Sequence, residues 1–251
     1  MIDPQHPVRR RGADAGQGVP PLSADLAPSR RVLIVIVALV AADVVWFALI
    51  AEDVLEGGGL VSHDQSVLTW FVDHRTDWLV SAARFVSTVG GFVSLLIVAA
   101  VGGLWLWRRR VHVVLAAAPL VSLVLGSLAS TVTKAWFGRD RPPVSVHATT
   151  VTLAAFPSGH ATDAAAFFLA ASLTLSLTVA RRRSTQLVFI GAGLVLAVLV
   201  GVSRLVLAVH WLSDVVAGWA LGSAIAMTVV VALWYAVTRT KEPADRPDRA
   251  A

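Results

Sequence analysis

The chain contains no cysteine, and only 15% of its 251 residues are charged. Without cysteine, disulfide bonds, thiolate metal sites and cysteine nucleophiles are all excluded. In contrast, hydrophobic residues make up 56% of the chain and the mean hydropathy is +0.72. These values lie outside the usual range of soluble globular domains and indicate an integral membrane protein.

The net charge is +5, but the positive charges are not arranged for binding nucleic acid. Of the 21 Lys and Arg residues, 15 lie in four clusters that flank apolar segments: Arg9, Arg10, Arg11, Arg30 and Arg31; Arg108 to Arg110; Arg181 to Arg183; and Arg239, Lys241, Arg246 and Arg249. Such flanks are typical of the positive-inside bias of membrane proteins, so the clusters are interpreted as cytoplasmic anchors. No basic stripe with interleaved aromatic residues occurs, and no nucleic-acid partner is expected.

Six apolar segments are long enough to cross a hydrocarbon core of about 30 Å, which takes about 20 residues in a helix. They are residues 32–51, 78–107, 111–133, 160–180, 186–203 and 211–237. The second contains Gly90-Gly91, which predicts a tilt or a kink. Residues 64–77, between the first two segments, have apolar positions at helical spacing and predict a short amphipathic helix on the membrane surface.

The predicted fold class is therefore all-α, an integral membrane bundle of six transmembrane helices over residues 32–237. Residues 1–31 are rich in proline, glycine and charge, so we expect a disordered cytoplasmic arm. Residues 238–251 are polar and predict a disordered cytoplasmic tail. No soluble domain and no long repeat is found.

The order of the spans predicts the topology. With the amino terminus inside the cell, all four basic clusters fall on the cytoplasmic side. The remaining basic residues fall at or near the opposite side; they are Arg75, Arg84, Lys134, Arg139, Arg141 and Arg204. We therefore expect a multi-pass protein of the cell (inner or plasma) membrane with both termini in the cytoplasm.

Three polar segments are predicted to meet on the extracytoplasmic face. They are Lys134–Pro142 (KAWFGRDRP), Phe156–His160 (FPSGH) and Ser203–Asp214 (SRLVLAVHWLSD). If the ligand is a phosphate, Lys134, Arg141 and Arg204 can neutralise its charge. Gly159 allows close approach of the backbone at the start of the fourth helix, and Ser158 adds a hydroxyl donor.

The same segments carry groups for nucleophilic chemistry. His210 and Asp214 are spaced i, i+4 and share one face of a helix, so the carboxylate can accept a proton from one ring nitrogen and leave the other as a nucleophile. His160 is then available to protonate the leaving oxygen. Each residue taken alone also fits a simpler role, because Lys and Arg at helix ends usually reach for the interface and Pro-Ser-Gly is a common turn.

The three segments match a tripartite phosphatase signature, read here as K-x6-R-P, P-S-G-H and S-R-x5-H-x3-D. The chain resembles the type 2 phosphatidic acid phosphatase superfamily, which also contains soluble acid phosphatases and vanadium haloperoxidases. The resemblance implies that His210 forms a phosphohistidine, that Asp214 orients it and that His160 protonates the leaving group. It also implies that the phosphate is held by Lys134, Arg141, Ser158, Gly159 and Arg204, and that no metal or cofactor is needed.

The expected function is hydrolysis of the phosphate or diphosphate headgroup of a membrane lipid, with undecaprenyl diphosphate, phosphatidic acid and phosphatidylglycerol phosphate as candidates. A phosphotransferase that passes the phosphoryl group to an alcohol is the first alternative. An anion or lipid transporter is less favoured, because the polar groups cluster at one end of the spans. No obligate protein partner is inferred. We expect Asp43 to pair with Arg84 and Asp163 to be an acid of a helix first turn.

Overall fold

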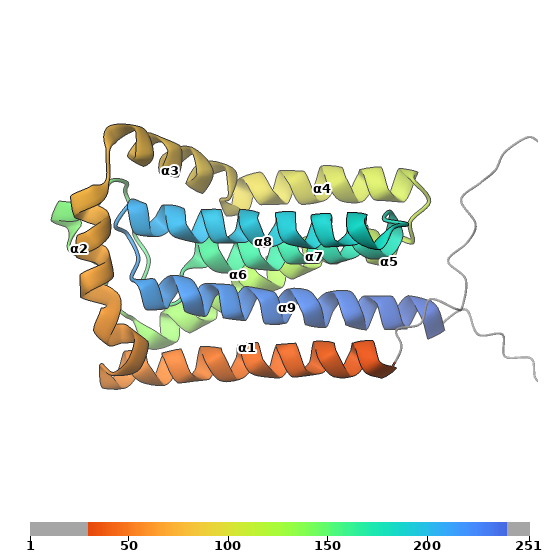
Figure 1. Ribbon diagram of the computed structural model, residues 1–251, viewed down its shortest axis with the longest axis horizontal. Helices are drawn as coiled ribbons and strands as arrows, with labels where there is room; N and C mark the ends of the chain where they lie inside the picture. The colour runs from red at the N-terminus through yellow and green to blue at the C-terminus, as the bar shows by residue number, and fades with distance from the viewer. Residues whose placement is uncertain (1–29, 240–251) are drawn as a thin grey trace, which may run out of the picture.

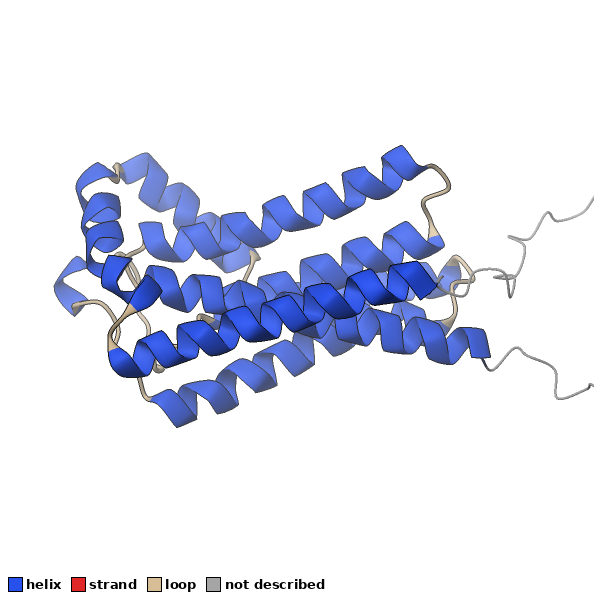
Figure 2. Cartoon of the chain, turned by 60° about the horizontal axis from the view of Figure 1, so that its bottom comes forward, coloured by secondary structure: helices blue, strands red, loops and turns tan. Residues whose placement is uncertain are grey.

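The computed structural model describes residues 30–239, and every element in this range is a helix. The long helices lie side by side in a bundle (Figures 1 and 2). The cytoplasmic arm expected over residues 1–31 and the tail expected over 238–251 fall almost entirely outside the described residues. Their described parts, residues 30–31 and 238–239, are helical.

Residues 30–239 contain six candidate spans when a bent helix pair is counted as one. Five single helices are long and apolar enough to cross a membrane: α1 (Arg30–Glu56), α6 (Ala118–Phe137), α7 (Gly159–Thr178), α8 (Arg183–Val206) and α9 (Leu212–Arg239). The sixth span is a bent pair, α3 (Asp77–Val89) and α4 (Phe92–Arg108), whose axes differ by 50°. The bend falls at Gly90 and Gly91, where the kink was predicted.

The third predicted span, residues 111–133, differs from the structure at both ends. A short helix, α5 (Val113–Ala116), comes first, and α6 begins only at Ala118. Pro119 fits the first turn of α6 because that turn leaves its N–H groups unpaired in any case. The helix continues to Phe137 and ends at Gly138, whose left-handed φ of +57° allows its N–H to donate to the Lys134 carbonyl. Lys134 therefore lies inside the last helical turn.

Helix α7 occupies the centre of the bundle and packs mainly against α9, α8 and α6. Most of its buried side chains are small, among them Ala161, Ala164, Ala165, Ala166 and Ala170. On α9, a Cβ at Gly218 would lie 2.8 Å from the Ser158 carbonyl oxygen, and one at Gly222 would overlap the Thr162 carbonyl. Gly218 and Gly222, a small-xxx-small pair, therefore bring α9 into backbone contact with α7.

The short helix α2 (Asp64–His74) lies across one end of the bundle, after the 3-10 turn η2 (Gly59–His63) (Figure 1). Its existence was predicted, but its apolar face is turned toward protein. Leu68 is buried, and Phe71 packs against two core clusters that include Val206 and Val215. Helix α2 thus covers the end of the bundle at which the polar segments lie.

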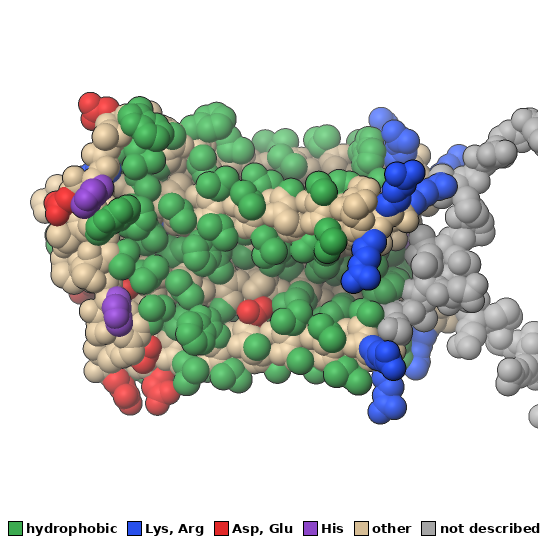
Figure 3. All heavy atoms as spheres, in the orientation of Figure 1, with side chains coloured by type: hydrophobic (Ala, Val, Ile, Leu, Met, Phe, Trp, Pro, Cys, Tyr) green, Lys and Arg blue, Asp and Glu red, His purple; other side chains and the backbone are tan. Residues whose placement is uncertain are grey.

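Charge is divided between the two ends of the bundle (Figure 3). On the visible face, Lys and Arg gather at the end where α4 and α9 finish, and Asp, Glu and His gather at the α2 end; the surface between them is mostly apolar, with an acidic side chain near its middle. The basic clusters at Arg108 to Arg110 and Arg181 to Arg183, together with Arg239, are all exposed. The members of the four basic clusters that fall within the described residues therefore lie at one end of the molecule.

The predicted pair of Asp43 and Arg84 does not form. Asp43 accepts a hydrogen bond of 2.7 Å from the Ser223 hydroxyl, and Arg84 donates to the Ala148 carbonyl at 2.7 and 3.0 Å. The reason is packing: α1, which carries Asp43, lies against α9, whereas α3, which carries Arg84, lies against α8.

Candidate active site

The structure brings the three polar segments together at the α2 end of the bundle. Lys134 comes from the last turn of α6, His160 from the first turn of α7 and Arg204 from the end of α8. His210 lies in the turn between α8 and α9, and Asp214 in the first turn of α9. Residues up to 80 positions apart in the sequence thus form one cluster, as the alternation of spans predicted.

His210 and Asp214 form a buried pair. The His210 Nδ1 lies 3.2 Å from the Asp214 Oδ2, and the two side chains are 2% and 0% exposed. The same carboxylate oxygen accepts a hydrogen bond of 2.9 Å from the Trp211 backbone N–H. Because a carboxylate accepts, the pair favours the His210 tautomer with hydrogen on Nδ1 and a free lone pair on Nε2.

The surroundings of His210 favour a neutral ring. Burial lowers the pKa of the His210 imidazole well below its ordinary value, and neighbouring positive groups, Arg141 first, lower the pKa further. A neutral imidazole with an unprotonated Nε2 is the form that can attack a phosphorus atom.

An ion-pair network behind Asp214 was not foreseen from the sequence. Arg139 donates to the Asp214 Oδ1 at 2.6 Å and to the Asp64 Oδ2 at 2.7 Å. Ser213 joins the same network, because its hydroxyl and its backbone N–H donate to Asp64 at 2.5 and 2.9 Å. Arg139 therefore bridges α9 to the first residue of α2 and compensates the buried charge on both carboxylates.

The sequence carried only weak signals for this network. Arg139 lies inside the K-x6-R-P segment, but at one of its unspecified positions. Asp64 is separated from Ser213 by 149 residues and looked like an ordinary acid at the start of an amphipathic helix. Only the docking of α2 across the end of the bundle shows that these residues support the His210–Asp214 pair.

Lys134 is placed differently from the prediction that it donates to a phosphate. Its ammonium donates to three backbone carbonyls, those of Ala154 at 2.8 Å, Ala155 at 3.1 Å and Pro157 at 2.6 Å. An ammonium has three N–H donors, so all of them hold the loop that leads into α7. Lys134 still contributes a buried positive charge to the cluster.

Arg141 also contacts the same loop and in addition the proposed nucleophile. It donates to the carbonyls of Leu153 and Val209, each at 2.6 Å, and its Nη1 lies 3.1 Å from the His210 Nε2. The guanidinium therefore marks the position in front of Nε2 where an anion would be attracted. A phosphoryl group that approaches Nε2 must displace or share this contact.

Two buried donors in the cluster have no hydrogen-bond partner among the described residues. They are the Ser158 hydroxyl and the Arg204 Nε, in side chains that are almost completely inaccessible. The Arg204 Nη1 contacts the Ser87 hydroxyl on α3. The backbone N–H groups of the first α7 turn, which begins at Gly159, are additional free donors because a helix leaves them unpaired. Unpaired buried donors are costly unless they meet an acceptor, so this set fits an anion.

No neighbouring side chain requires a glycine at position 159. A Cβ at this position would lie 3.7 Å from the Lys134 Cε and from the Ser130 Oγ, which is ordinary van der Waals contact. The predicted close approach at Gly159 thus concerns a ligand and stays a prediction.

His160, Asp163 and His147 complete the surroundings. The His160 Nε2 faces the α3–α4 bend, 3.5 Å from the place where a Cβ on Gly91 would lie. Asp163 was expected in the first turn of a helix, but it lies beyond the first turn of α7; it is buried, and its Oδ1 has no hydrogen-bond partner within residues 30–239. His147 lies 2.8 Å from the Pro142 carbonyl and ties the active-site loop to itself.

No group of three His, Asp or Glu side chains in the described part of the chain lies close enough to hold a metal ion. The chemistry that the cluster offers comes from the two histidines, the Asp214 carboxylate and the surrounding cationic groups.

A helical membrane bundle with a buried histidine–carboxylate pair and several cations at one end fits a membrane phosphatase. The sequence comparisons agree with this class. Residues 115–239 match the PAP2 superfamily. Phosphatidylglycerophosphatase B of Bacillus subtilis (strain 168) is 32% identical over 188 residues, which cover 70% of this chain and 86% of that protein. The chain therefore belongs to the PAP2 superfamily.

A solved structure shows the same fold. The crystal structure of a transmembrane PAP2 type phosphatidylglycerolphosphate phosphatase from Bacillus subtilis superposes with a TM-score of 0.67 at 23% identity. The match covers 84% of this chain and 98% of the other. The resemblance noted from the signature is thus confirmed, as are the multi-pass helical membrane fold and the expected enzyme class, a lipid phosphate hydrolase.

Proposed function

We propose that this protein hydrolyses the phosphate monoester of a membrane glycerolipid through a phosphohistidine on His210. The observation that carries the proposal is the buried His210–Asp214 pair. It leaves the His210 Nε2 without a hydrogen, so that the lone pair of this nitrogen faces Arg141. The unpaired donors of Ser158 and Arg204 in the same cluster support a phosphate as the ligand.

In the first half-reaction, the His210 Nε2 attacks the phosphorus atom, the N–P bond forms and the ester P–O bond breaks. The departing alkoxide takes a proton from His160, which acts as the general acid. Asp214 holds the Nδ1–H and stabilises the positive charge that develops on the ring. The products of this step are the lipid alcohol and the phosphorylated enzyme.

In the second half-reaction, His160 accepts a proton from water and the resulting hydroxide attacks the phosphohistidine. The N–P bond breaks, inorganic phosphate leaves and both histidines return to their initial states. The Ser158 hydroxyl, the Arg204 Nε and the first amides of α7 provide donors for the charged equatorial oxygens. Lys134 acts chiefly through its charge, because its donors hold the loop before α7.

The topology supports a site on the extracytoplasmic side of the cell membrane. The exposed clusters Arg108 to Arg110 and Arg181 to Arg183, together with Arg239, lie at the end opposite the catalytic cluster, and the positive-inside bias assigns that end to the cytoplasm. Both described termini of the chain, at Arg30 and Arg239, lie at that same end (Figure 1). A substrate would then keep its phosphate in the outer headgroup layer and its chains in lipid.

Phosphatidylglycerol phosphate is the substrate best supported, because the curated relative that covers most of this chain carries the name phosphatidylglycerophosphatase B. Undecaprenyl diphosphate and phosphatidic acid are the alternatives that a site in the headgroup layer also accommodates. A panel of these three lipids and a soluble sugar phosphate tests the assignment with purified protein in excess chelator. The highest kcat/KM on phosphatidylglycerol phosphate supports the substrate assignment, whereas a preference for another lipid replaces it by that lipid. Loss of activity on chelation contradicts a metal-free reaction.

The nucleophile is tested by comparing His210→Ala with His112→Ala. His112 lies at the opposite end of the bundle, so its removal should leave turnover within twofold of the parent. His210→Ala should lower kcat by about 10⁴-fold or more, because loss of a catalytic nucleophile removes the covalent route altogether. It should also abolish acid-labile phosphoenzyme trapped from radiolabelled substrate. A retained phosphoenzyme in this variant would assign the covalent step to another residue.

A phosphotransferase uses the same phosphoenzyme, with an alcohol in place of water. Adding glycerol or a diacylglycerol to the reaction distinguishes the two outcomes. Hydrolysis releases one inorganic phosphate per lipid alcohol at all acceptor concentrations, whereas transfer lowers that ratio as the acceptor increases.

A further inference from the structure

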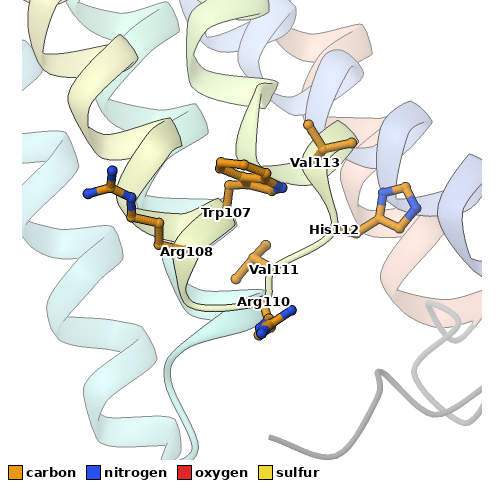
Figure 4. A pocket seen from close by; sticks show the side chains of 6 residues that line it. All are labelled: Trp107, Arg108, Arg110, Val111, His112 and Val113. Atoms are coloured by element: carbon orange, nitrogen blue, oxygen red, sulfur yellow. The ribbon is translucent and has the colours of Figure 1, made fainter. Parts of the chain in front are cut away.

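A cavity lies at the end of the bundle opposite the catalytic cluster, where α4 turns into α5. It has a volume of about 510 Å³ and is lined by Trp107, Arg108, Arg110, Val111, His112 and Val113 (Figure 4). None of the residues assigned to phosphate hydrolysis contributes to it. Two exposed guanidinium groups therefore border one concave surface at an end of a membrane span.

The turn itself is shaped by Arg110. Its φ is +66°, a left-handed conformation that glycine or asparagine adopts more easily than arginine. The turn is closed by the hydrogen bonds from Arg110 N–H to the Trp107 carbonyl and from Val111 N–H to the Leu106 carbonyl. Arg109, between the two lining arginines, instead lies over the Trp105 ring at 5.1 Å. The three consecutive arginines thus differ in what they contact.

His112 provides a further donor. Its Nδ1 accepts a hydrogen bond of 3.3 Å from the Val114 backbone N–H, so the neutral ring carries its hydrogen on Nε2. Two arginines and one histidine therefore line the cavity, and none of its lining residues in the described part of the chain is acidic. This composition is complementary to an anion.

An apolar groove continues directly from this cavity. It has a volume of about 250 Å³, shares Trp107 and Val113 with the basic cavity and runs between α4 and α6 past Ala100, Gly103 and Leu104. Both hollows thus meet at one indole ring, with positive charge on one side of it and an apolar surface within the span on the other.

We propose that this joined pair of hollows binds an anionic phospholipid, with the headgroup phosphate at Arg108 and Arg110 and one acyl chain in the groove. A headgroup with net negative charge matches the two cations, whereas a zwitterionic headgroup brings its own positive charge to them. The adjoining groove places a binding surface for the chain next to the charge. The site is separate from the hydrolytic one and does not depend on the proposed substrate.

The test uses the full-length protein in a neutral detergent and measures binding of dioleoyl phosphatidylserine and dioleoyl phosphatidylcholine by native mass spectrometry. Phosphatidylserine should bind more tightly than phosphatidylcholine. Arg108→Gln/Arg110→Gln should weaken phosphatidylserine binding by about 25-fold, since about 1 kcal/mol for each cation corresponds to about fivefold. Arg181→Gln/Arg182→Gln removes the same charge from another exposed cluster and should change binding by less than twofold.

A second variant tests the groove with the arginines intact. Ala100→Trp fills the groove between α4 and α6 and should weaken phosphatidylserine binding about tenfold, while Ala41→Trp on the exposed face of α1 should not. Turnover of a short-chain lipid phosphate by each variant reports folding. Equal losses in the two double arginine variants would show general charge attraction and overturn the site. Unchanged binding in Ala100→Trp would overturn the proposed place of the chain.

Discussion

Arginine is found at both ends of the bundle, but the arginines of the candidate site are buried or partly buried whereas those of the opposite end are exposed. At the α2 end, Arg204 is 4% exposed and Arg139 is enclosed between two carboxylates. At the other end, Arg108 and Arg182 are exposed and take part in no ion pair within the described residues. Burying an ion costs several kcal/mol unless partners compensate it. Burial therefore separates the arginines of the candidate site from the exposed arginines that are predicted to be anchors.

The compensation itself is unequal at the α2 end. Arg139 has two carboxylate partners, whereas Arg204 contacts the Ser87 hydroxyl and leaves its Nε unpaired among the described residues. The first arrangement is complete within the protein and fits a structural support for Asp214. The second is incomplete and fits a group whose partner is the substrate.

The largest effect in this comparison is expected from Arg139→Gln. Removing this charge leaves Asp64 and Asp214 buried without compensation, and the Asp214 Oδ1 loses its contact of 2.6 Å. We expect kcat to fall about 10- to 100-fold with KM changed less than threefold, the range typical when a group that orients a reactive side chain is lost. The free energy of unfolding should fall by about 3 kcal/mol.

Two further variants show whether Arg139 acts by position or by stability alone. Adding Asp64→Asn to Arg139→Gln removes one uncompensated charge, so stability should recover in part while kcat stays low. Arg84→Gln, which removes an exposed arginine from the same end, should leave kcat within twofold. Recovery of kcat together with stability would mean that the network serves only folding.

A smaller effect is expected from Gly218→Ala, which adds a methyl group where α9 packs closely against α7. A Cβ in Gly218→Ala would lie 2.8 Å from the Ser158 carbonyl and 2.9 Å from the Ala161 Cβ, so α9 and the start of α7 must separate. We expect a loss of about 1 to 3 kcal/mol in the free energy of unfolding and about a tenfold lower kcat. Thermal unfolding and lipid-phosphate turnover measure both effects.

Gly191→Ala is the matched control, because nothing lies within 4 Å of the Cβ that it adds to α8. This variant should be as stable as the parent or more stable by up to about 1 kcal/mol, since alanine favours the helix. If both substitutions destabilise the protein equally, the contact between α9 and the α7 turn is not what limits the packing there.

The parts of this arrangement that depend on local pattern were predictable, and the parts that depend on docking were not. The six spans follow from runs of apolar residues, and the meeting of Lys134, His160 and His210 follows from counting spans. The end of α6 was missed by one turn, because apolarity declines before the left-handed cap at Gly138 stops the helix.

Contacts of the cations were the least predictable feature. The signature indicates that Lys134 belongs to the site, but its three carbonyl partners come from a loop whose path depends on tertiary packing. Similarly, Asp64 meets Ser213 only because α2 folds back across the bundle. Residue types and their spacing in the sequence identify which residues form the cluster. Only the three-dimensional structure shows which acceptor each donor contacts.

The smallest expected change concerns the protonation of His210. Because burial and the nearby cations lower its pKa, the ring should remain neutral as the pH falls through 6.5, the ordinary value for histidine. Below that pH the unfolded chain binds the proton and the folded chain does not, so this residue makes the fold less stable as the pH decreases. NMR spectra of the imidazole nitrogens should show hydrogen on the His210 Nδ1 and none on its Nε2 from pH 7.5 to pH 6. The His210 signals are assigned by their absence from the spectra of His210→Gln. A midpoint of protonation at or above 6.5 would contradict this, and it would mean that the cations around His210 are better screened than its burial indicates.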